Sequence, residues 1–250
     1  MSHFPYQLTT PIGSAATLGL IVLQADETVE QDFQRLFAAP DQALYVTRIP
    51  SGADVTPETL RQMERDLPHA ASLLPPSVAF STVGYACTSG ATMIGPDRVA
   101  ELIRGACDTQ ASTDPLTAAR AALRALGITR LGIVSPYVAS VAEPVRHALG
   151  AAGVETPETL SFGESSEARV ARIDPASIRA AALDLGRRGG LDGLFLSCTN
   201  LRTLDVIDEI EAELGIPVVS SNLALAWHMA TQAGLALPHA PGRLMRQLAG

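Results

Sequence analysis

The stretch LGLIVL at residues 18–23 sets the pattern of the chain, and LGIVS at residues 131–135 repeats it 113 residues further on. An unbroken run of branched aliphatic residues is typical of a strand buried on both faces, as strands of parallel sheets are. Other short apolar runs alternate with helical patterns around both stretches. This alternation predicts an α/β protein whose parallel sheets are covered by helices on both sides.

The expected elements follow this alternation through the chain. Strands are expected at residues 18–23, 43–49, 77–82, 131–135, 193–197 and 218–220. Helices are expected at residues 31–37, 56–67, 96–106, 115–126, 138–149, 174–187, 202–214 and 224–234. Thr56, which precedes a proline, is a typical helix N-cap, and Gly127 is typical of the position that ends a helix.

Two cysteines hold nearly the same spacing as the repeated strands. Cys87 and Cys198 are 111 residues apart, and each follows an apolar run and precedes a threonine, in ACTS at 86–89 and SCTN at 197–200. Two motifs with matching offsets indicate duplicated halves. The alternative is coincidence, because Leu-Gly followed by branched residues is common in α/β proteins.

Composition limits the classes of function. Of 250 residues, 47% are hydrophobic and 18% are charged, which is typical of a globular protein with a sizeable core. The net charge of −8 argues against a nucleic-acid partner, which needs a basic face, but allows a small anionic ligand. No secretory leader or membrane segment is recognisable. We therefore expect a cytoplasmic protein without a membrane partner, whose three dispersed cysteines form no disulfide framework.

Cys87 and Cys198 are expected at the carboxyl ends of parallel strands, where α/β sheets bind their ligands. A helix that starts there favours the thiolate, and nearby hydroxyl, amide and backbone donors suit a carboxylate or an oxyanion. These donors belong to Thr88, Ser89, Thr199 and Asn200. The alternative for a single cysteine is a small buried hydrophobic residue. We adopt that interpretation for Cys107, which is expected inside a helix.

No metal or cofactor motif is found in the sequence. It contains no CxxC, no HxxxH, no G-x-G-x-x-G and no P-loop, so neither a metal nor a cofactor is expected. Two thiols can catalyse a reaction without a metal or a cofactor. One thiolate takes a proton next to a carboxylate while the other thiol delivers one from the opposite face, or one thiolate adds to a C=C bond, allows rotation and leaves.

Over nearly its whole length the chain resembles the aspartate/glutamate racemase superfamily, in its branch of maleate cis–trans isomerases, arylmalonate decarboxylases and ectoine-utilisation proteins, and six stretches mark the resemblance. They are LGLIVLQADETVEQDF (18–33), GYACTSG (84–90), LGIVSPY (131–137), SFGESSEARVARIDP (161–175), LFLSCTNLRTLD (194–205) and IPVVSSNLALAWH (216–228). The resemblance implies two pseudo-symmetric Rossmann-like α/β halves with the active site in the cleft between them. We assign residues 1–108 to the first half, which residues 219–250 rejoin, and residues 109–218 to the second.

The resemblance also implies roles for single residues. Cys87 and Cys198 match the catalytic pair, and Tyr137 matches a substrate-binding tyrosine of the maleate isomerases. Thr88 and Ser89 match the carboxylate donors of the decarboxylases. Because the decarboxylases carry glycine in place of the first cysteine, the presence of both thiols favours proton exchange or cis–trans isomerisation. The resemblance further implies a homodimer.

Two departures bear on the substrate. Asp26 stands where maleate isomerases carry an asparagine after the first strand, and the stretch around Ser165 and Ser166 lacks another expected asparagine. An acid at position 26 repels a substrate carboxylate or pairs with a substrate amine. An amino-acid-like substrate or an intermediate of ectoine degradation is therefore favoured over maleate, with Asp26 and Tyr137 orienting it.

Three hypotheses follow for the function. The first is a cofactor-independent isomerase, either a racemase or epimerase or a cis–trans isomerase, that acts on a small carboxylate or dicarboxylate with both cysteines. The second is an arylmalonate-type decarboxylase with one proton-donating cysteine. The third is a carboxylate-binding or thiol-sensing protein without catalytic activity.

Overall fold

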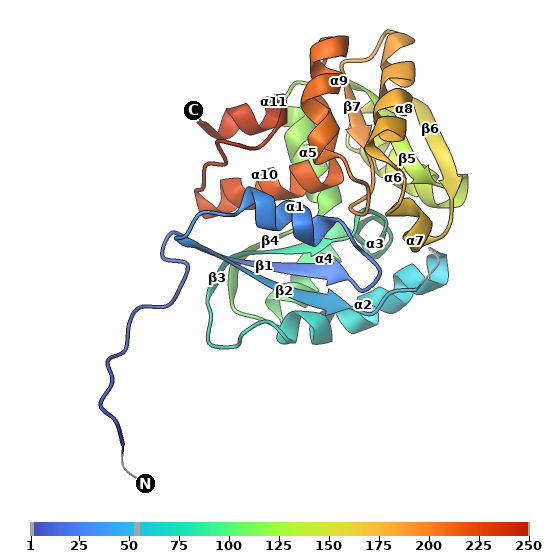
Figure 1. Ribbon diagram of the computed structural model, residues 1–250. Helices are drawn as coiled ribbons and strands as arrows, with labels where there is room; N and C mark the ends of the chain where they lie inside the picture. The colour runs from blue at the N-terminus through green and yellow to red at the C-terminus, as the bar shows by residue number, and fades with distance from the viewer. Residues whose placement is uncertain (1–2, 53–55, 250) are drawn as a thin grey trace.

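The computed structural model describes residues 3–52 and 56–249, which form two parallel sheets of four strands (Figure 1). The first sheet has the order β2-β1-β3-β4, and the second has the equivalent order β6-β5-β7-β8. The strands are β1 (Ala16–Leu23), β2 (Gln42–Ile49), β3 (Phe80–Ala86), β4 (Thr109–Thr113), β5 (Arg130–Tyr137), β6 (Glu155–Glu164), β7 (Gly193–Leu196) and β8 (Val218–Ser220). The expected α/β architecture of two pseudo-symmetric halves is confirmed.

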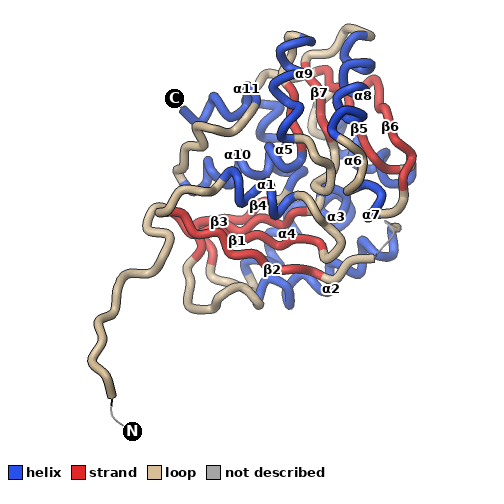
Figure 2. The backbone as a smooth tube through the Cα atoms, in the orientation of Figure 1, coloured by secondary structure: helices blue, strands red, loops and turns tan. Residues whose placement is uncertain are grey.

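Helices lie against both sheets, and Figure 2 shows them as an outer layer over the strands. They are α1 (Val29–Leu36), α2 (Pro57–Ser72), α3 (Thr88–Ile94), α4 (Pro96–Arg104), α5 (Pro115–Ala125), α6 (Ala139–Ala151), α7 (Glu167–Val170), α8 (Pro175–Arg187), α9 (Ile207–Leu214), α10 (Ser221–Ala233) and α11 (Gly242–Met245), with short 3-10 turns at Leu204–Val206 and Arg246–Ala249. No helix in the described ranges is long and apolar enough to cross a bilayer.

The two Leu-Gly stretches form the equivalent strands β1 and β5, each paired on both sides by neighbours of its own half. The glycine of each stretch is required by close packing. A Cβ atom at Gly19 would lie 2.9 Å from the side chain of Val83, and one at Gly132 would lie 2.7 Å from that of Leu191. The repeated motif therefore marks the point where neighbouring side chains come closest to each central strand.

Several expected elements are corrected by the structure. The third strand spans Phe80–Ala86 instead of residues 77–82, and the edge strands β4 and β6 lie where no strand was expected. Both edge strands carry polar side chains, TQAST and ETPETLSFGE, and therefore lack the unbroken apolar signal of the central strands; in β6 most of these side chains are exposed or half-buried. Helix α4 ends at Arg104, so Cys107 lies beyond the helix, half-buried, and its thiol is 3.5 Å from the Ile103 carbonyl.

The C-terminal part of the chain returns to the first half. β8 belongs to the second sheet, while α10, which follows it directly, packs against α5, β3 and β4 (Figure 1). β4 pairs with β3, so the first sheet continues through residues 109–113. The proposed division of the chain at residue 108, with a return at residue 219, stays a prediction. Its outer ends at residues 1–2 and 250 lie outside the described residues.

Asn222, in the first turn of α10, connects the halves. Its amide donates to the Asp32 carboxylate on α1 (2.7 Å) and to the Thr199 carbonyl after β7 (2.8 Å). Burial raises the pKa of Asp32 to about 6, although the hydrogen bond from Asn222 opposes the rise. An ionised Asp32 is therefore a cost to folding at neutral pH, and folding takes up a proton between about pH 4 and pH 6.

We predict that Asp32→Asn raises the free energy of unfolding at pH 7 by about 1 to 3 kcal/mol, because it removes a buried charge and keeps an acceptor for Asn222. The gain should shrink as the pH falls from about 6 to about 4, where the wild-type carboxyl becomes protonated. Denaturant unfolding of the wild type and the variant at pH 7 and pH 4 measures this gain. Equal stability differences at the two pH values would contradict the prediction.

Candidate active site

A pocket lies between the halves at the carboxyl ends of β3 and β7, and both Cys87 and Cys198 line it. The first sheet contributes one thiol and the second sheet the other, as the repeated motifs predict. The pocket is lined by Leu23, Ser51, Gly52, Thr59, Leu60, Met63, Cys87, Thr88, Ser89, Tyr137, Glu167, Cys198 and Thr199. One acid and no basic side chain occur among these residues.

Cys87 is the N-cap residue of α3, directly after β3. Its Sγ atom accepts a hydrogen bond from the backbone N–H of Gly90 at 3.2 Å. Residue 90 must be glycine, because a Cβ atom there would lie 2.4 Å from the Tyr85 hydroxyl and 3.0 Å from the Cys87 sulfur. Burial raises the pKa of Cys87 to about 12, and the hydrogen bond from Gly90 opposes this rise.

Cys198 follows β7 with a backbone φ of 153°, the only positive φ of a non-glycine residue in the parts of the chain that the structure describes. This conformation favours glycine, so Cys198 carries backbone strain of about 1 to 3 kcal/mol. Two contacts hold it in place: its N–H donates to the Ser221 hydroxyl (3.0 Å), and its sulfur accepts the N–H of Asn200 (3.3 Å). Burial raises the pKa of this thiol well above its usual range, and the nearby Glu167 adds to the rise.

Tyr137, the last residue of β5, contacts Cys198. Its hydroxyl oxygen lies 3.1 Å from the cysteine sulfur and donates to the carboxylate of Glu167 at 2.8 Å. Glu167 opens α7, is almost fully buried and also accepts the side-chain amide of Asn200 at 2.9 Å. Burial raises the pKa of Glu167, and the two hydrogen bonds oppose that rise.

Sequence reasoning did not single out Glu167. Its neighbours Ser165 and Ser166 drew attention for a missing asparagine, but neither lines the pocket. A glutamate in the first turn of a helix is ordinarily explained by the helix dipole. Only the fold brings this carboxylate to Tyr137, at the end of β5, and to Asn200, in the turn after β7.

The two cysteine loops are joined through Ser221. Thr88, Ser89 and Thr199 line the pocket, and their contact with a substrate stays a prediction. The Thr88 hydroxyl donates to Ser221 at 2.8 Å, and the Thr199 hydroxyl donates to the Ala86 carbonyl at 3.3 Å. Ser221 thus connects the two cysteine loops. It is the second residue that sequence reasoning missed, although it lies in the SSN stretch at 220–222.

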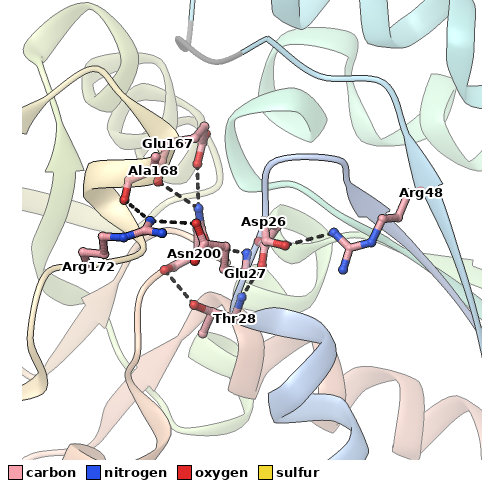
Figure 3. A network of polar contacts seen from close by, with 8 residues as sticks. All are labelled: Asp26, Glu27, Thr28, Arg48, Glu167, Ala168, Arg172 and Asn200. Carbon is pink, nitrogen blue, oxygen red and sulfur yellow. Dashed lines mark hydrogen bonds and ion pairs between the residues drawn. The ribbon is translucent and has the colours of Figure 1, made fainter.

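Asp26 and Asn200 are not among the residues that line the pocket. They belong to a polar network that also contains the lining residue Glu167 (Figure 3). One Asp26 oxygen accepts the N–H groups of Thr28 and Val29, both at 2.8 Å, which fixes the start of α1. Burial raises the pKa of Asp26, and these two hydrogen bonds lower it. The Asn200 amide oxygen accepts the N–H of Glu27 at 2.9 Å. Contact of either residue with a substrate stays a prediction.

The arrangement suits proton exchange between a bound molecule and two thiols that are shielded from solvent. Both sulfurs are buried, each accepts one backbone N–H, and each stands beside a tyrosine hydroxyl. Within residues 3–52 and 56–249, no group of three histidine, cysteine or acidic side chains could hold a metal ion.

The chain belongs to the arylmalonate decarboxylase family, whose model matches residues 18–245. It is 30% identical to the arylmalonate decarboxylase of Bordetella bronchiseptica over 244 residues, covering 92% of this chain and 95% of the relative. It is 29% identical to the maleate isomerase of Nocardia farcinica over 249 residues, again covering 92% and 95%. The expected branch of the aspartate/glutamate racemase superfamily is thereby confirmed, and with it membership in a family of cysteine-dependent isomerases and decarboxylases.

A solved structure gives the same result for the fold. A cysteine-to-serine mutant of the Nocardia farcinica maleate cis–trans isomerase, with a covalently bound succinylcysteine intermediate, matches with a TM-score of 0.81 and 28% identity. The match covers 93% of this chain and 98% of that one. The expectation that the protein is an enzyme is confirmed by these relatives.

We predict that Gly90→Ala destabilises the protein by about 1 to 3 kcal/mol, because the added methyl group must displace Tyr85 or Cys87 in a packed site. Gly150→Ala is the matched control, since it lies in α6 and its Cβ atom would meet nothing within 4 Å. The control should gain about 0.5 to 1 kcal/mol from helix propensity. Thermal unfolding measures both changes, and equal melting temperatures of the two variants would contradict the packing argument.

Proposed function

We propose that the protein is a cofactor-independent isomerase of a small carboxylate or dicarboxylate, acting as a racemase or epimerase or as a cis–trans isomerase. The observation that carries the proposal is that Cys87 and Cys198, from equivalent strands of the two halves, line one pocket. A substrate held between them offers one face to each thiol. Protonation from one side and deprotonation from the other inverts a carbon centre.

The high pKa values of the two thiols fit the proton-donating part of this scheme. Burial favours the neutral form of each cysteine, so each is held as a proton donor, and the thiol that acts as base or nucleophile must first lose its own proton. A thiolate formed during turnover keeps one backbone donor, from Gly90 or from Asn200. Addition of one thiolate to a C=C bond is the second route to isomerisation, and the succinylcysteine intermediate of the Nocardia relative supports it by analogy.

Electrostatics of the pocket bear on the substrate. Glu167 is the acid of the lining, and Asp26 lies close enough to raise its pKa further. The Ser89 hydroxyl and the nearby backbone donors can bind one carboxylate, and the hydroxyls of Thr88 and Thr199 can join them by turning from Ser221 and the Ala86 carbonyl. A second carboxylate would have to approach an acidic wall, whereas an amine would be attracted to it. A screen should therefore contain amino acids as well as unsaturated dicarboxylates.

Decarboxylation by a single cysteine is the second candidate, because the chain matches the arylmalonate decarboxylase of Bordetella bronchiseptica at 30% identity. In that reaction only Cys198 would act, delivering a proton to the carbanion that loss of carbon dioxide leaves. Release of carbon dioxide from arylmalonates that needs Cys198 and not Cys87 would favour it. We also propose the homodimer that the resemblance implies, which sedimentation equilibrium tests.

We predict that Cys87→Ala and Cys198→Ala each lower turnover by at least about a hundredfold, because each removes one of the two groups that exchange protons with the substrate. Maleate, aspartate, diaminobutyrate derivatives and arylmalonates are incubated with the enzyme in deuterated water. Deuterium at an α-carbon identifies proton exchange, while fumarate without deuterium identifies addition and rotation.

Cys107→Ala is the matched control, because this third thiol is half-buried outside the pocket lining and should leave turnover unchanged. Circular dichroism should show that all three variants fold. Full activity in either the Cys87 or the Cys198 variant would overturn the two-thiol mechanism.

A further inference from the structure

Each thiol of the pocket has a tyrosine beside it, but the two tyrosines differ in what they contact next. The Tyr85 hydroxyl, near Cys87, donates to the Met63 sulfur at 3.4 Å, which is a weak acceptor. The Tyr137 hydroxyl, 3.1 Å from the Cys198 sulfur, donates to the Glu167 carboxylate at 2.8 Å. In the described part of the chain, the tyrosine beside Cys198 therefore donates to a buried carboxylate, whereas the tyrosine beside Cys87 donates to a thioether.

The orientation of the Asn200 amide fixes the role of Glu167. The Asn200 Oδ1 atom accepts the backbone N–H of Glu27 at 2.9 Å, so this atom must be the oxygen. Its amide nitrogen then points at Glu167 and donates to the Oε2 atom at 2.9 Å, as Figure 3 shows. Glu167 thus has a donor on each oxygen, which is the environment of an ionised carboxylate.

This arrangement decides which atom donates in the contact between Tyr137 and Cys198. A tyrosine hydroxyl has one hydrogen, and here Glu167 accepts it. The remaining contact of 3.1 Å then needs the S–H of Cys198 as its donor. Loss of that proton would leave two acceptors facing each other, unless the Tyr137 hydrogen turned away from Glu167.

We propose that Glu167 is a positioning residue that holds Cys198 in its protonated form by keeping the Tyr137 hydrogen on its carboxylate. The inference deepens the proposed function, on which it rests for the catalytic role of Cys198. It makes Cys198 the thiol that delivers a proton: the S–H bond breaks, its electron pair stays on sulfur, and the hydrogen forms a C–H bond with the substrate. The Tyr137 hydrogen can then turn to the new thiolate.

Among the described residues, no cation forms an ion pair with Glu167. Asp26, on the loop after β1, is a like charge that raises its pKa. Arg172, five residues further along the chain, forms an ion pair with Glu27 at 2.7 Å and donates to the Ala168 carbonyl (Figure 3). Arg169 is paired with Glu164. Tyr137 and Asn200 are therefore the groups through which the charge of Glu167 acts.

The test is Glu167→Gln, with the pH dependence of Cys198 alkylation as the readout. The glutamine carbonyl takes the Asn200 donor, and its NH₂ group donates to the Tyr137 oxygen. The Tyr137 hydrogen then turns to the Cys198 sulfur and favours the thiolate. We expect the midpoint of iodoacetamide labelling at Cys198, resolved by peptide mass spectrometry, to fall by at least about one pH unit, a tenfold change in thiolate fraction.

Tyr137→Phe separates this mechanism from the effect of charge alone. If Glu167 acts through the tyrosine, the Glu167→Gln shift measured in the Tyr137→Phe background should be less than half of the shift in the wild-type background. An equal shift in both backgrounds would mean that Glu167 acts on Cys198 only through the electric field of its charge, which would overturn the inference. No shift in either background would overturn the inference as well.

Glu211→Gln is the control for loss of a buried carboxylate. Glu211 on α9 is also buried and accepts the backbone N–H of Val218, but it lies outside the pocket lining. Its variant should lose stability and leave the Cys198 midpoint unchanged. A matching shift in this variant would assign the effect to general loosening of the fold.

Infrared spectroscopy of the wild-type protein covers the case in which Glu167→Gln does not fold. The S–H stretching band of Cys198, identified by its loss in Cys198→Ser, should lie at lowered frequency because the thiol donates to Tyr137. In Tyr137→Phe it should return to the frequency of a free thiol, and an unchanged band would overturn the inference. Neither the alkylation nor the infrared measurement needs a substrate. A turnover assay that contradicts the proposed function would therefore leave the result for Glu167 unchanged.

Discussion

The first turn of α10 holds the two halves of the molecule against each other, and the geometry of the pocket depends on it. Ser221 accepts hydrogen bonds from the Thr88 hydroxyl and the Cys198 N–H, which belong to different halves. Asn222 also bridges the halves, but as a donor: its side-chain amide donates to the Asp32 carboxylate and to the Thr199 carbonyl. Because α10 follows the last strand of the second sheet and packs on the first, its first turn ties the loop of one thiol to the loop of the other.

Burial is a second property, which the titratable groups of the site have in common. Desolvation is the largest cause of the raised pKa of Cys87, Cys198 and Glu167. In such a place charge is costly, so a proton is more easily passed between neighbours than released to water. In the second half of the site, the hydrogen bonds that Tyr137 makes to a thiol and a carboxylate set which of the three groups holds a proton. In the first half, the hydroxyl of Tyr85 donates to the thioether of Met63 instead.

The sequence alone predicts the parts of this structure that repeat or that follow local rules. The central strands could be recognised because burial on both faces requires unbroken apolar runs, and the cysteines could be placed because strand ends in parallel sheets meet at one edge. The edge strand β6 was missed, since half-exposed positions carry polar residues. Glu167 was missed because its function depends on Tyr137 and Asn200, which are 30 and 33 residues away.

The backbone of Cys198 has a consequence for how such a protein can change over time. Its φ of 153° is one that glycine adopts freely and cysteine only under strain. A glycine at this position would relax the chain and also delete the thiol. Gains in stability and losses of reactivity are therefore coupled at a single codon, and only selection for chemistry would keep a side chain there.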